Sequence, residues 1–176
     1  AEAHGLGAAF VTKRAADGTA LSSASAPGVV AMMLDQLDVR SGHRVLEIGA
    51  GTGYNAALLA HLAGPDGRVV TVDVDPECSA RARAALDAQG LGRVMVLTGD
   101  GTDGAAGRGA FDRVVITAGA WDVPPAWTEQ LAAGGRLVVP LRLRGQSRSV
   151  AFTHDPTGRF LRSDSIGLWV HPADRS

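Results

Sequence analysis

Short runs of Val, Ile and Leu alternate along this chain with Ala- and Leu-rich stretches that have helical spacing. The predicted strands are Arg44–Ile48, Arg68–Asp73, Arg93–Thr98, Phe111–Thr117 and Gly135–Leu141. The predicted helices are Ala26–Leu37, Tyr54–Ala63, Pro76–Gly90 and Pro124–Ala133. Strands with so little polar alternation are typical of parallel sheets that are covered on both faces. The pattern therefore predicts a doubly wound, Rossmann-like α/β fold with a mostly parallel sheet.

The pattern changes after Leu141. Ser147–Thr153 and Phe160–Val170 read as strands, and the turn-forming cluster His154–Gly158 separates them. We expect them to form an antiparallel hairpin on the edge of the sheet. The whole chain, 1–176, is predicted to be a single domain, with an N-terminal segment at 1–20 and a hairpin and tail at 142–176.

Charge and cysteine content exclude several classes of protein. The 17 basic and 18 acidic residues give a net charge of −1, whereas a dedicated nucleic-acid binder shows a basic face. A single cysteine, Cys78, excludes an internal disulfide framework and a multi-cysteine metal site, and the five histidines show no metal-ligand spacing. The longest apolar run is too short to span a bilayer. We expect a cytoplasmic protein with no metal and with no nucleic-acid or membrane partner.

The start of the sequence shows neither the basic nor the apolar part of a signal peptide. It also has no initiator Met. We expect this chain to belong to a longer one.

A glycine-rich loop joins the first predicted strand directly to a helix. Gly49, Gly51 and Gly53 stand at alternate positions, which allows a sharp turn and a close approach of a ligand to the helix N-terminus. In a dinucleotide-binding loop the third glycine comes three residues after the second, whereas here it comes two after. The spacing is wrong for a pyrophosphate and right for S-adenosylmethionine (SAM). The alternative is a plain strand-to-helix turn.

Acidic residues end the next two predicted strands. Asp73 lies where a carboxylate accepts ribose hydroxyls, and Asp100, between Gly99 and Gly101, is placed to take the adenine amino group. Either aspartate alone is equally well explained as a turn or N-cap residue. Together with the glycine loop, at consecutive strand ends, they favour a cofactor site.

These residues resemble the class I SAM-dependent methyltransferases and, within them, the protein-L-isoaspartate O-methyltransferase family. Ser23–Pro27 is similar to that family's Thr-Ile-Ser-x-Pro segment, and Gly99–Gly104 to its Gly-Asp-Gly-x-x-Gly loop. Leu131–Pro140 tracks its fifth-strand region, and the resemblance covers about Ala20–Leu141.

The resemblance implies transfer of a methyl group from SAM to a side-chain or isoaspartyl carboxylate of a peptide or protein. The products are S-adenosyl-L-homocysteine and a methyl ester that can collapse to a succinimide. The residues expected to bind the cofactor are Glu47, Gly49, Gly51, Gly53, Tyr54, Asp73, Val74, Gly99, Asp100, Gly101 and Thr117.

Three of the candidate residues have two interpretations each. Ser25 is the candidate catalytic residue, as a hydrogen-bond donor to the acceptor carboxylate, or it is the N-cap of the helix that follows. Glu47 orients the loop or contacts the SAM amino group. Tyr54 either covers the methionine end of SAM or packs against other side chains of the protein. A carboxylate is already ionised at neutral pH, so the reaction needs no general base.

Two segments depart from ordinary repair enzymes. Phe10–Lys13 and Trp121–Trp127 look more like an actinobacterial branch associated with ribosomally made peptides such as lanthipeptides and graspetides. Trp121 and Trp127 are candidates for the wall of a substrate cleft, although Trp127, on a helix, is better explained by core packing. This branch implies a dedicated aspartate methyltransferase of peptide maturation.

Three further alternatives stay open. In the first, the protein is a methyltransferase whose acceptor is a small molecule in place of a peptide. In the second, it is a nicotinamide-dependent oxidoreductase. In the third, it is a non-catalytic module that binds SAM or docks a peptide.

Overall fold

The structure is a computed structural model that describes residues 10–14, 17–18, 20–143, 146–154 and 160–167. Its helices are α1 (Pro27–Leu37), α2 (Tyr54–Ala63), α3 (Pro76–Ala88) and α4 (Pro125–Glu129), with a 3₁₀ turn, η1 (Gly101–Asp103). Its strands are β1 (Phe10–Arg14), β2 (Ala20–Ala24), β3 (Arg44–Ile48), β4 (Arg68–Asp73), β5 (Met95–Thr98), β6 (Phe111–Ile116), β7 (Leu131–Leu143), β8 (Gln146–His154) and β9 (Phe160–Gly167).

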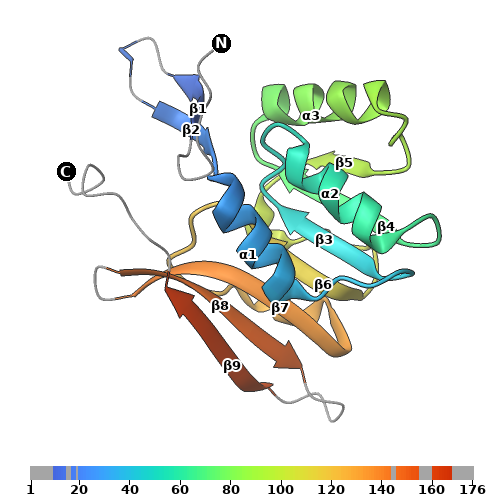
Figure 1. Ribbon diagram of the computed structural model, residues 1–176, viewed down its shortest axis with the longest axis vertical. Helices are drawn as coiled ribbons and strands as arrows, with labels where there is room; N and C mark the ends of the chain where they lie inside the picture. Colours follow the sequence, from blue (N-terminus) through green and yellow to red (C-terminus); the bar gives the residue numbers. More distant parts are fainter. Residues whose placement is uncertain (1–9, 15–16, 19, 144–145, 155–159, 168–176) are drawn as a thin grey trace.

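Seven of these strands form one sheet in the order β5-β4-β3-β6-β7-β8-β9 (Figure 1). Pairing is parallel from β5 to β7 and antiparallel from β7 through β8 to β9. This confirms the predicted doubly wound fold and the antiparallel C-terminal strands. The carboxyl ends of β3, β4, β5 and β6 meet at one edge, where open α/β sheets bind ligands.

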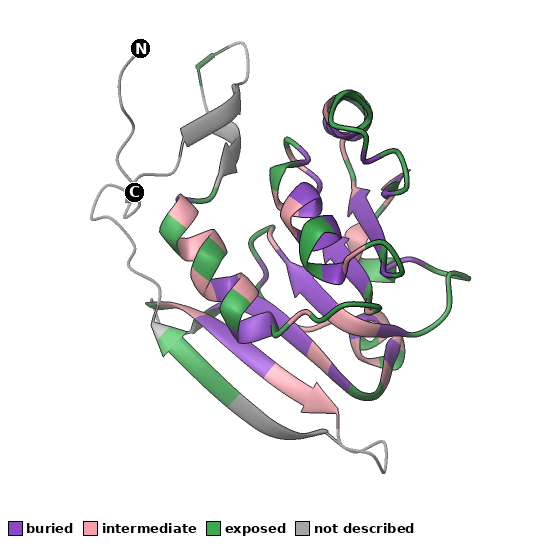
Figure 2. Ribbon diagram, turned by 45° about the vertical axis from the view of Figure 1, so that its right-hand side comes forward, coloured by how far each residue is buried: buried purple, intermediate pink, exposed green. Residues whose placement is uncertain are grey.

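The central strands are buried on both faces because helices and loops cover each side (Figure 2). Val45 of β3 packs in a cluster with the apolar residues of α1, α2 and α3. Its neighbours Leu46 and Ile48 point to the other face and pack with Trp127 of α4 and with Ala105. This alternation explains why the strands read as continuous apolar runs.

The predicted element boundaries are confirmed to different degrees. β3, β4 and α2 begin and end where the sequence predicted, whereas β5 begins at Met95 and α3 ends at Ala88. Asp75 caps α3 as expected, because its side chain accepts a hydrogen bond from the N–H of Glu77.

The predicted helix Pro124–Ala133 is wrong in its second half. α4 ends at Glu129, and β7 begins at Leu131, opposite Phe111 of β6. The side chain of Gln130 holds this junction, since its Oε1 accepts from Ala105 N at 2.8 Å and its Nε2 donates to the Asp103 carbonyl at 2.8 Å. Gly134, with φ of +73°, lies in an irregularity of the β6–β7 pairing instead of ending a helix.

Two features before α1 differ from the sequence-based prediction. β1 and β2 form an antiparallel ribbon beside the N-terminal end of α1, where no strands were predicted (Figure 1). The N-cap of α1 is Ala26 and has no side-chain cap bond, so the interpretation of Ser25 as the N-cap is wrong. Pro27 occupies the first turn as expected.

Hydrogen bonds of buried side chains fix α1 over the antiparallel strands. Gln36 of α1 is buried, and its Oε1 accepts from Ser149 Oγ of β8 at 2.6 Å. Its Nε2 donates to Asp164 Oδ1 of β9 at 3.2 Å. Ser25 lies two residues before the start of α1, so the attachment of this helix helps to position Ser25 relative to the sheet.

Candidate functional site

The three glycines of the loop between β3 and α2 all have positive φ, which is compatible with the sharp turn that the sequence predicts. Gly49, Gly51 and Gly53 have φ of +106°, +52° and +79°. A Cβ on Gly49 would lie 2.6 Å from Thr117 Oγ1, and one on Gly53 would lie 3.2 Å from Ala82 Cα on α3. Gly49 therefore lets the loop approach the end of β6, whereas Gly53 lets α2 approach α3.

Thr117 ties the loop to the end of β6. Its hydroxyl lies 2.7 Å from the carbonyl oxygen of Gly49 and 3.0 Å from that of Ile48, and it donates to these two acceptors. The backbone N–H of Thr117 also donates to the Ile48 carbonyl. The loop is thus held before any ligand binds.

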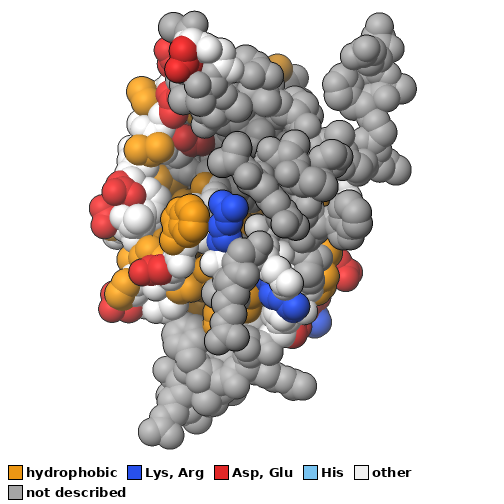
Figure 3. Space-filling view, turned by 90° about the vertical axis from the view of Figure 1, so that its left-hand side faces the viewer, with side chains coloured by type: hydrophobic (Ala, Val, Ile, Leu, Met, Phe, Trp, Pro, Cys, Tyr) orange, Lys and Arg blue, Asp and Glu red, His pale blue; other side chains and the backbone are white. Residues whose placement is uncertain are grey.

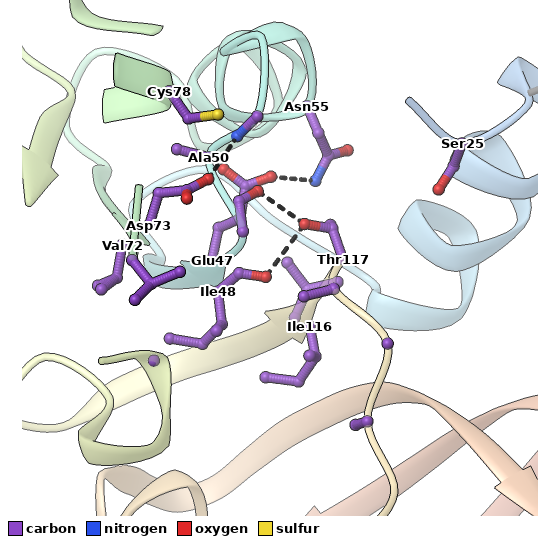
Figure 4. A pocket seen from close by; sticks show the side chains of 18 of the residues that line it. Ser25, Glu47, Ile48, Ala50, Asn55, Val72, Asp73, Cys78, Ile116 and Thr117 are labelled. Carbon is purple, nitrogen blue, oxygen red and sulfur yellow. Dashed lines mark hydrogen bonds between the residues drawn. The ribbon is translucent and has the colours of Figure 1, made fainter. Parts of the chain in front are cut away.

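Glu47 lies fully buried beneath the loop (Figure 4). Its Oε1 accepts from Asn55 Nδ2 of α2 at 2.8 Å, and its Oε2 accepts from Thr71 Oγ1 of β4 at 2.7 Å. Burial raises the pKa of this carboxyl to about 7, and the two hydrogen bonds oppose that rise. These bonds join Glu47 to α2 and β4 and not to Gly49–Gly53, so its two interpretations, orienting the loop and contacting the SAM amino group, both stay predictions. The sequence analysis did not predict Asn55 as a site residue. Its position in the first turn of α2, directly after Tyr54, was the signal that could have indicated it.

The two aspartates predicted at strand ends both bind backbone N–H groups. Asp73 Oδ2 accepts from Gly51 N at 2.9 Å, and its Oδ1 accepts from Asp75 N at 3.0 Å. Asp100 is exposed and its Oδ1 accepts from Thr102 N at 2.9 Å, a bond that lowers the pKa of the carboxyl. Both aspartates therefore make the contacts expected of turn and N-cap residues, which was the alternative to cofactor binding. A carboxylate oxygen accepts more than one hydrogen bond, so these contacts leave room for a ligand.

A cavity of about 1020 Å³ opens at this edge of the sheet. Its size is at the upper end of the ~300–1,000 Å³ of small-molecule sites. It brings together most of the predicted residues: Ser25, Glu47, Gly49, Gly51, Tyr54, Asp73, Val74, Asp100, Gly101 and Thr117. Gly53 and Gly99 do not line it.

The candidate catalytic residue Ser25 lies apart from the glycine loop. Figure 4 shows it just before α1, across the cavity from Glu47 and Asp73. Ser25 is exposed. The cavity thus has one wall from the loops after β3 and β4, and a second wall from Ser25, α1 and the loop after β6.

The two tryptophans in the loop and helix after β6 differ sharply in burial. Trp121 is 78% exposed, whereas Trp127 is only 4% exposed, and both line the cavity. The indole N–H of Trp127 donates to the Gly101 carbonyl at 2.7 Å and so supports the Asp100 loop. Core packing, the preferred interpretation of Trp127, is confirmed. Cys78 is buried as expected, and it too lines the cavity.

Five carboxyl side chains line this cavity, and none of its described lining residues is Lys, Arg or His. The carboxyl groups belong to Glu47, Asp73, Asp75, Asp100 and Asp122. Glu47, with a pKa of about 7, is only partly ionised at neutral pH, and the four aspartates carry most of the negative charge of the lining. Such a lining attracts cations and repels anions. A pyrophosphate is therefore disfavoured by charge as well as by glycine spacing.

The histidines of the described residues lie elsewhere. His43 is at the opposite edge of the sheet, before β3, and accepts a hydrogen bond from Arg40 N at its Nδ1. His61 lies on the exposed side of α2, and His154 ends β8. Within the described ranges, we find no group of three or more His, Cys, Asp and Glu that could hold a metal ion. No helix there has the length and apolar character to cross a membrane.

Comparison with known proteins gives consistent matches. A family model described as Protein-L-isoaspartate(D-aspartate) O-methyltransferase matches residues 10–166. A protein-L-isoaspartate O-methyltransferase of Methanopyrus kandleri is 52% identical over 118 residues, 66% of this chain and 52% of the relative. One of Geotalea uraniireducens is 44% identical over 143 residues, 81% of this chain and 64% of the relative. The chain thus spans about half to two thirds of these relatives.

Solved structures agree with the sequence matches. A protein-L-isoaspartate O-methyltransferase superposes with a TM-score of 0.77 at 29% identity, over 90% of this chain and 51% of that one. A Plasmodium falciparum structure, described as such an enzyme in complex with S-adenosyl-L-homocysteine, has a TM-score of 0.72 at 17% identity. It covers 84% of this chain and 73% of its own, and at that identity it supports the fold alone.

Proposed function

This chain belongs to the protein-L-isoaspartate(D-aspartate) O-methyltransferase family, and we propose that it transfers a methyl group from SAM to an isoaspartyl or aspartyl carboxylate of a peptide or protein. The observation that carries this proposal is the acidic cavity beside the glycine loop. Its charge fits a ligand with a sulfonium and an ammonium group.

The residues present fit SAM on two grounds. Gly51 lines the cavity at φ of +52°, and nothing lies within 4 Å of its Cβ position, so a ligand has room to approach the loop backbone there. The lining contains five carboxyl groups and no described basic side chain. This charge suits SAM, which carries two positive groups, a sulfonium and an ammonium, and a single carboxylate. SAM supplies the methyl group on an electrophilic carbon. Its product would be S-adenosyl-L-homocysteine.

We assign the residues as follows. Asp73 binds the ribose hydroxyls, Asp100 the adenine amino group, and Glu47 the methionine end through the loop that it orients. Gly49, Gly51, Gly101, Tyr54, Val74 and Thr117 shape the remaining wall. Gly53 and Gly99 act indirectly, because they do not line the cavity.

The acceptor carboxylate requires alignment more than chemical activation. A C–O bond forms as a C–S bond breaks, and no proton has to be removed because the acceptor is already ionised. Ser25 donates a hydrogen bond to the acceptor carboxylate and aligns it. The absence of histidine from the described lining is compatible with a reaction that uses no general base.

A narrower function is favoured by one observation. Trp121 is 78% exposed at the cavity, a large aromatic surface for a peptide to pack on. It supports a dedicated peptide-maturation enzyme of the actinobacterial type, in which an aspartate of a ribosomally made peptide is methylated. The balanced net charge and single cysteine fit a cytoplasmic setting.

The test is incubation with methyl-labelled SAM and two matched peptides that differ only in isoaspartate or aspartate at one position. We expect methyl incorporation that is released by mild base, as a carboxyl ester would be. Label that resists base would move the acceptor to nitrogen or carbon and overturn the proposal. Preference for the isoaspartyl peptide indicates repair, and preference for the aspartyl peptide indicates peptide maturation.

Calorimetry separates the remaining classes. We expect SAM to bind and NAD to show no binding. Binding of NAD instead of SAM would favour an oxidoreductase. SAM binding without turnover on either peptide would favour a non-catalytic module.

A further inference from the structure

The acidic cavity creates a difficulty for the proposed acceptor, which is itself an anion. Five carboxyl groups line the cavity, and the described lining contains no basic side chain to offset them. A carboxylate that approaches this opening is repelled at short range. Efficient capture of an acidic peptide therefore requires a positive group at the rim.

Arg142 is such a group. It lies near the end of β7, opposite Ser147 of β8, and is exposed. An isolated parallel bridge between Ala120 and Leu141 brings the loop after β6 against the end of β7. The guanidinium carbon of Arg142 lies 5.5 Å from the centre of the Trp121 ring, and Trp121 lines the cavity.

The Trp121 ring gives the guanidinium of Arg142 a cation–π contact. Such a contact uses the charge of the guanidinium and does not replace hydrogen bonds from its N–H groups to an oxygen acceptor. Among the described residues, Arg142 forms no ion pair, in contrast to Arg40, Arg113 and Arg136, which each pair with an aspartate. Figure 3 shows one side of the molecule, where a basic side chain lies next to a hydrophobic one and acidic side chains lie at the left, at the top and at the right.

We propose that Arg142, stacked on Trp121, is a binding subsite for a second carboxylate of the acceptor peptide, an acidic side chain next to the residue that is methylated. This inference rests on the proposed function for the identity of the ligand as a peptide. The planar fork of arginine matches a carboxylate in two parallel hydrogen bonds. The enzyme then selects acidic peptides, although its cavity is acidic.

The experiment measures binding first, so that it does not depend on turnover. Two end-blocked fluorescent isoaspartyl peptides are compared, one with Glu on both sides of the isoaspartate and the other with Gln at those positions. Their Kd values are measured with S-adenosyl-L-homocysteine present. We expect the Glu peptide to bind about fivefold more tightly, the scale of one well-oriented ion pair at a surface, and this preference to shrink at high salt.

Four variants test whether Arg142 causes this preference for the Glu peptide. Arg142→Gln should remove it by weakening only the Glu peptide, and Arg142→Glu should reverse it. Arg68→Gln changes the net charge equally at the start of β4, the opposite edge of the sheet, and should keep the preference. Trp121→Ala should reduce it, because the guanidinium loses the ring that holds it.

The outcomes separate this inference from the function on which it rests. Equal binding of the two peptides to the wild type, or an unchanged preference in Arg142→Gln, overturns the subsite. A preference that depends on Arg142, with no methylation of either peptide, supports the subsite and contradicts the proposed function. Methylation of both peptides at the same kcat/KM in wild type and Arg142→Gln supports the function and contradicts the subsite.

Discussion

The two walls of the cavity are built in different ways. The wall formed by the loops after β3 and β4 lies in one stretch of sequence, and hydrogen bonds to Thr71, Asn55 and the loop backbone hold its carboxyl groups. The other wall gathers Ser25, Trp121 and, at its rim, Arg142 from three distant segments, and these side chains are exposed. The first wall is preorganised for a ligand that does not vary, and the second leaves side chains free to select an acceptor.

The largest expected effect contrasts the two tryptophans. Trp127→Ala should lower the free energy of unfolding by about 3–5 kcal/mol, because it empties a buried site and removes the donor to the Gly101 carbonyl. Trp121→Ala, at an exposed site, should change it by less than about 0.5 kcal/mol. Urea unfolding measures both.

If Trp127→Ala does not fold, Trp127→Phe keeps the comparison measurable. It retains an aromatic ring and loses the N–H donor, at a cost of about 1 kcal/mol. If substitution of Trp121 lowered the free energy of unfolding as much as substitution of Trp127, the two walls would not differ in the way described.

The second prediction concerns pH. The pKa of Glu47 is raised by burial from 4.5 to about 7, so between these values the folded protein holds a proton that the unfolded chain has released. The free energy of unfolding should therefore fall as the pH rises from about 4.5 to about 7, by on the order of 3 kcal/mol.

Glu47→Gln cannot titrate and should lose this dependence, so that it is more stable than the wild type at pH 8. Urea unfolding at pH 5 and pH 8 tests this. Asp122→Asn, which removes an exposed carboxyl from the second wall, is the control and should keep the wild-type slope. An unchanged slope in Glu47→Gln would show that another group titrates.

The third prediction concerns the backbone of the loop. Gly49→Ala should destabilise the protein by about 1–3 kcal/mol, because a Cβ at φ of +106° meets Thr117 Oγ1 at 2.6 Å. It should also weaken SAM binding, measured by calorimetry. Gly99→Ala is the control, since nothing lies within 4 Å of its Cβ, and it should be neutral or stabilise by less than about 1 kcal/mol. If Gly49→Ala and Gly99→Ala had equal effects on stability and SAM binding, position 49 of the loop would tolerate a side chain.

The smallest effect on stability is expected at Ser25. Ser25→Ala should leave unfolding and SAM affinity unchanged, because Ser25 makes no capping bond to α1. It should lower kcat about tenfold, the cost of one hydrogen bond to a charged group. A loss of stability of about 1 kcal/mol would instead restore the N-cap interpretation. Equal loss of kcat and SAM affinity would move Ser25 to the cofactor wall.

How far the sequence predicted the molecule also differs between the two walls. β3, β4 and α2 follow from apolar runs and glycines that act within a few residues. Gly49 and Gly51 were predicted to allow a sharp turn, and both have positive φ. The ribbon of β1 and β2 and the Arg142–Trp121 pair gave no such local signal, because each depends on pairing between separate segments.

The sequence by itself determined the alternation of strands and helices, the position of the glycine loop and the acidic residues at strand ends. These features arise from periodicity, from the freedom of glycine at positive φ and from chain direction in a parallel sheet. Only the tertiary structure decided that Leu131 begins a strand, because Gln130 bonds to residues 103 and 105. The tertiary structure also placed the indole N–H of Trp127 against the Gly101 carbonyl and left Trp121 exposed. Long-range contacts select among local alternatives that the sequence leaves nearly equal in free energy.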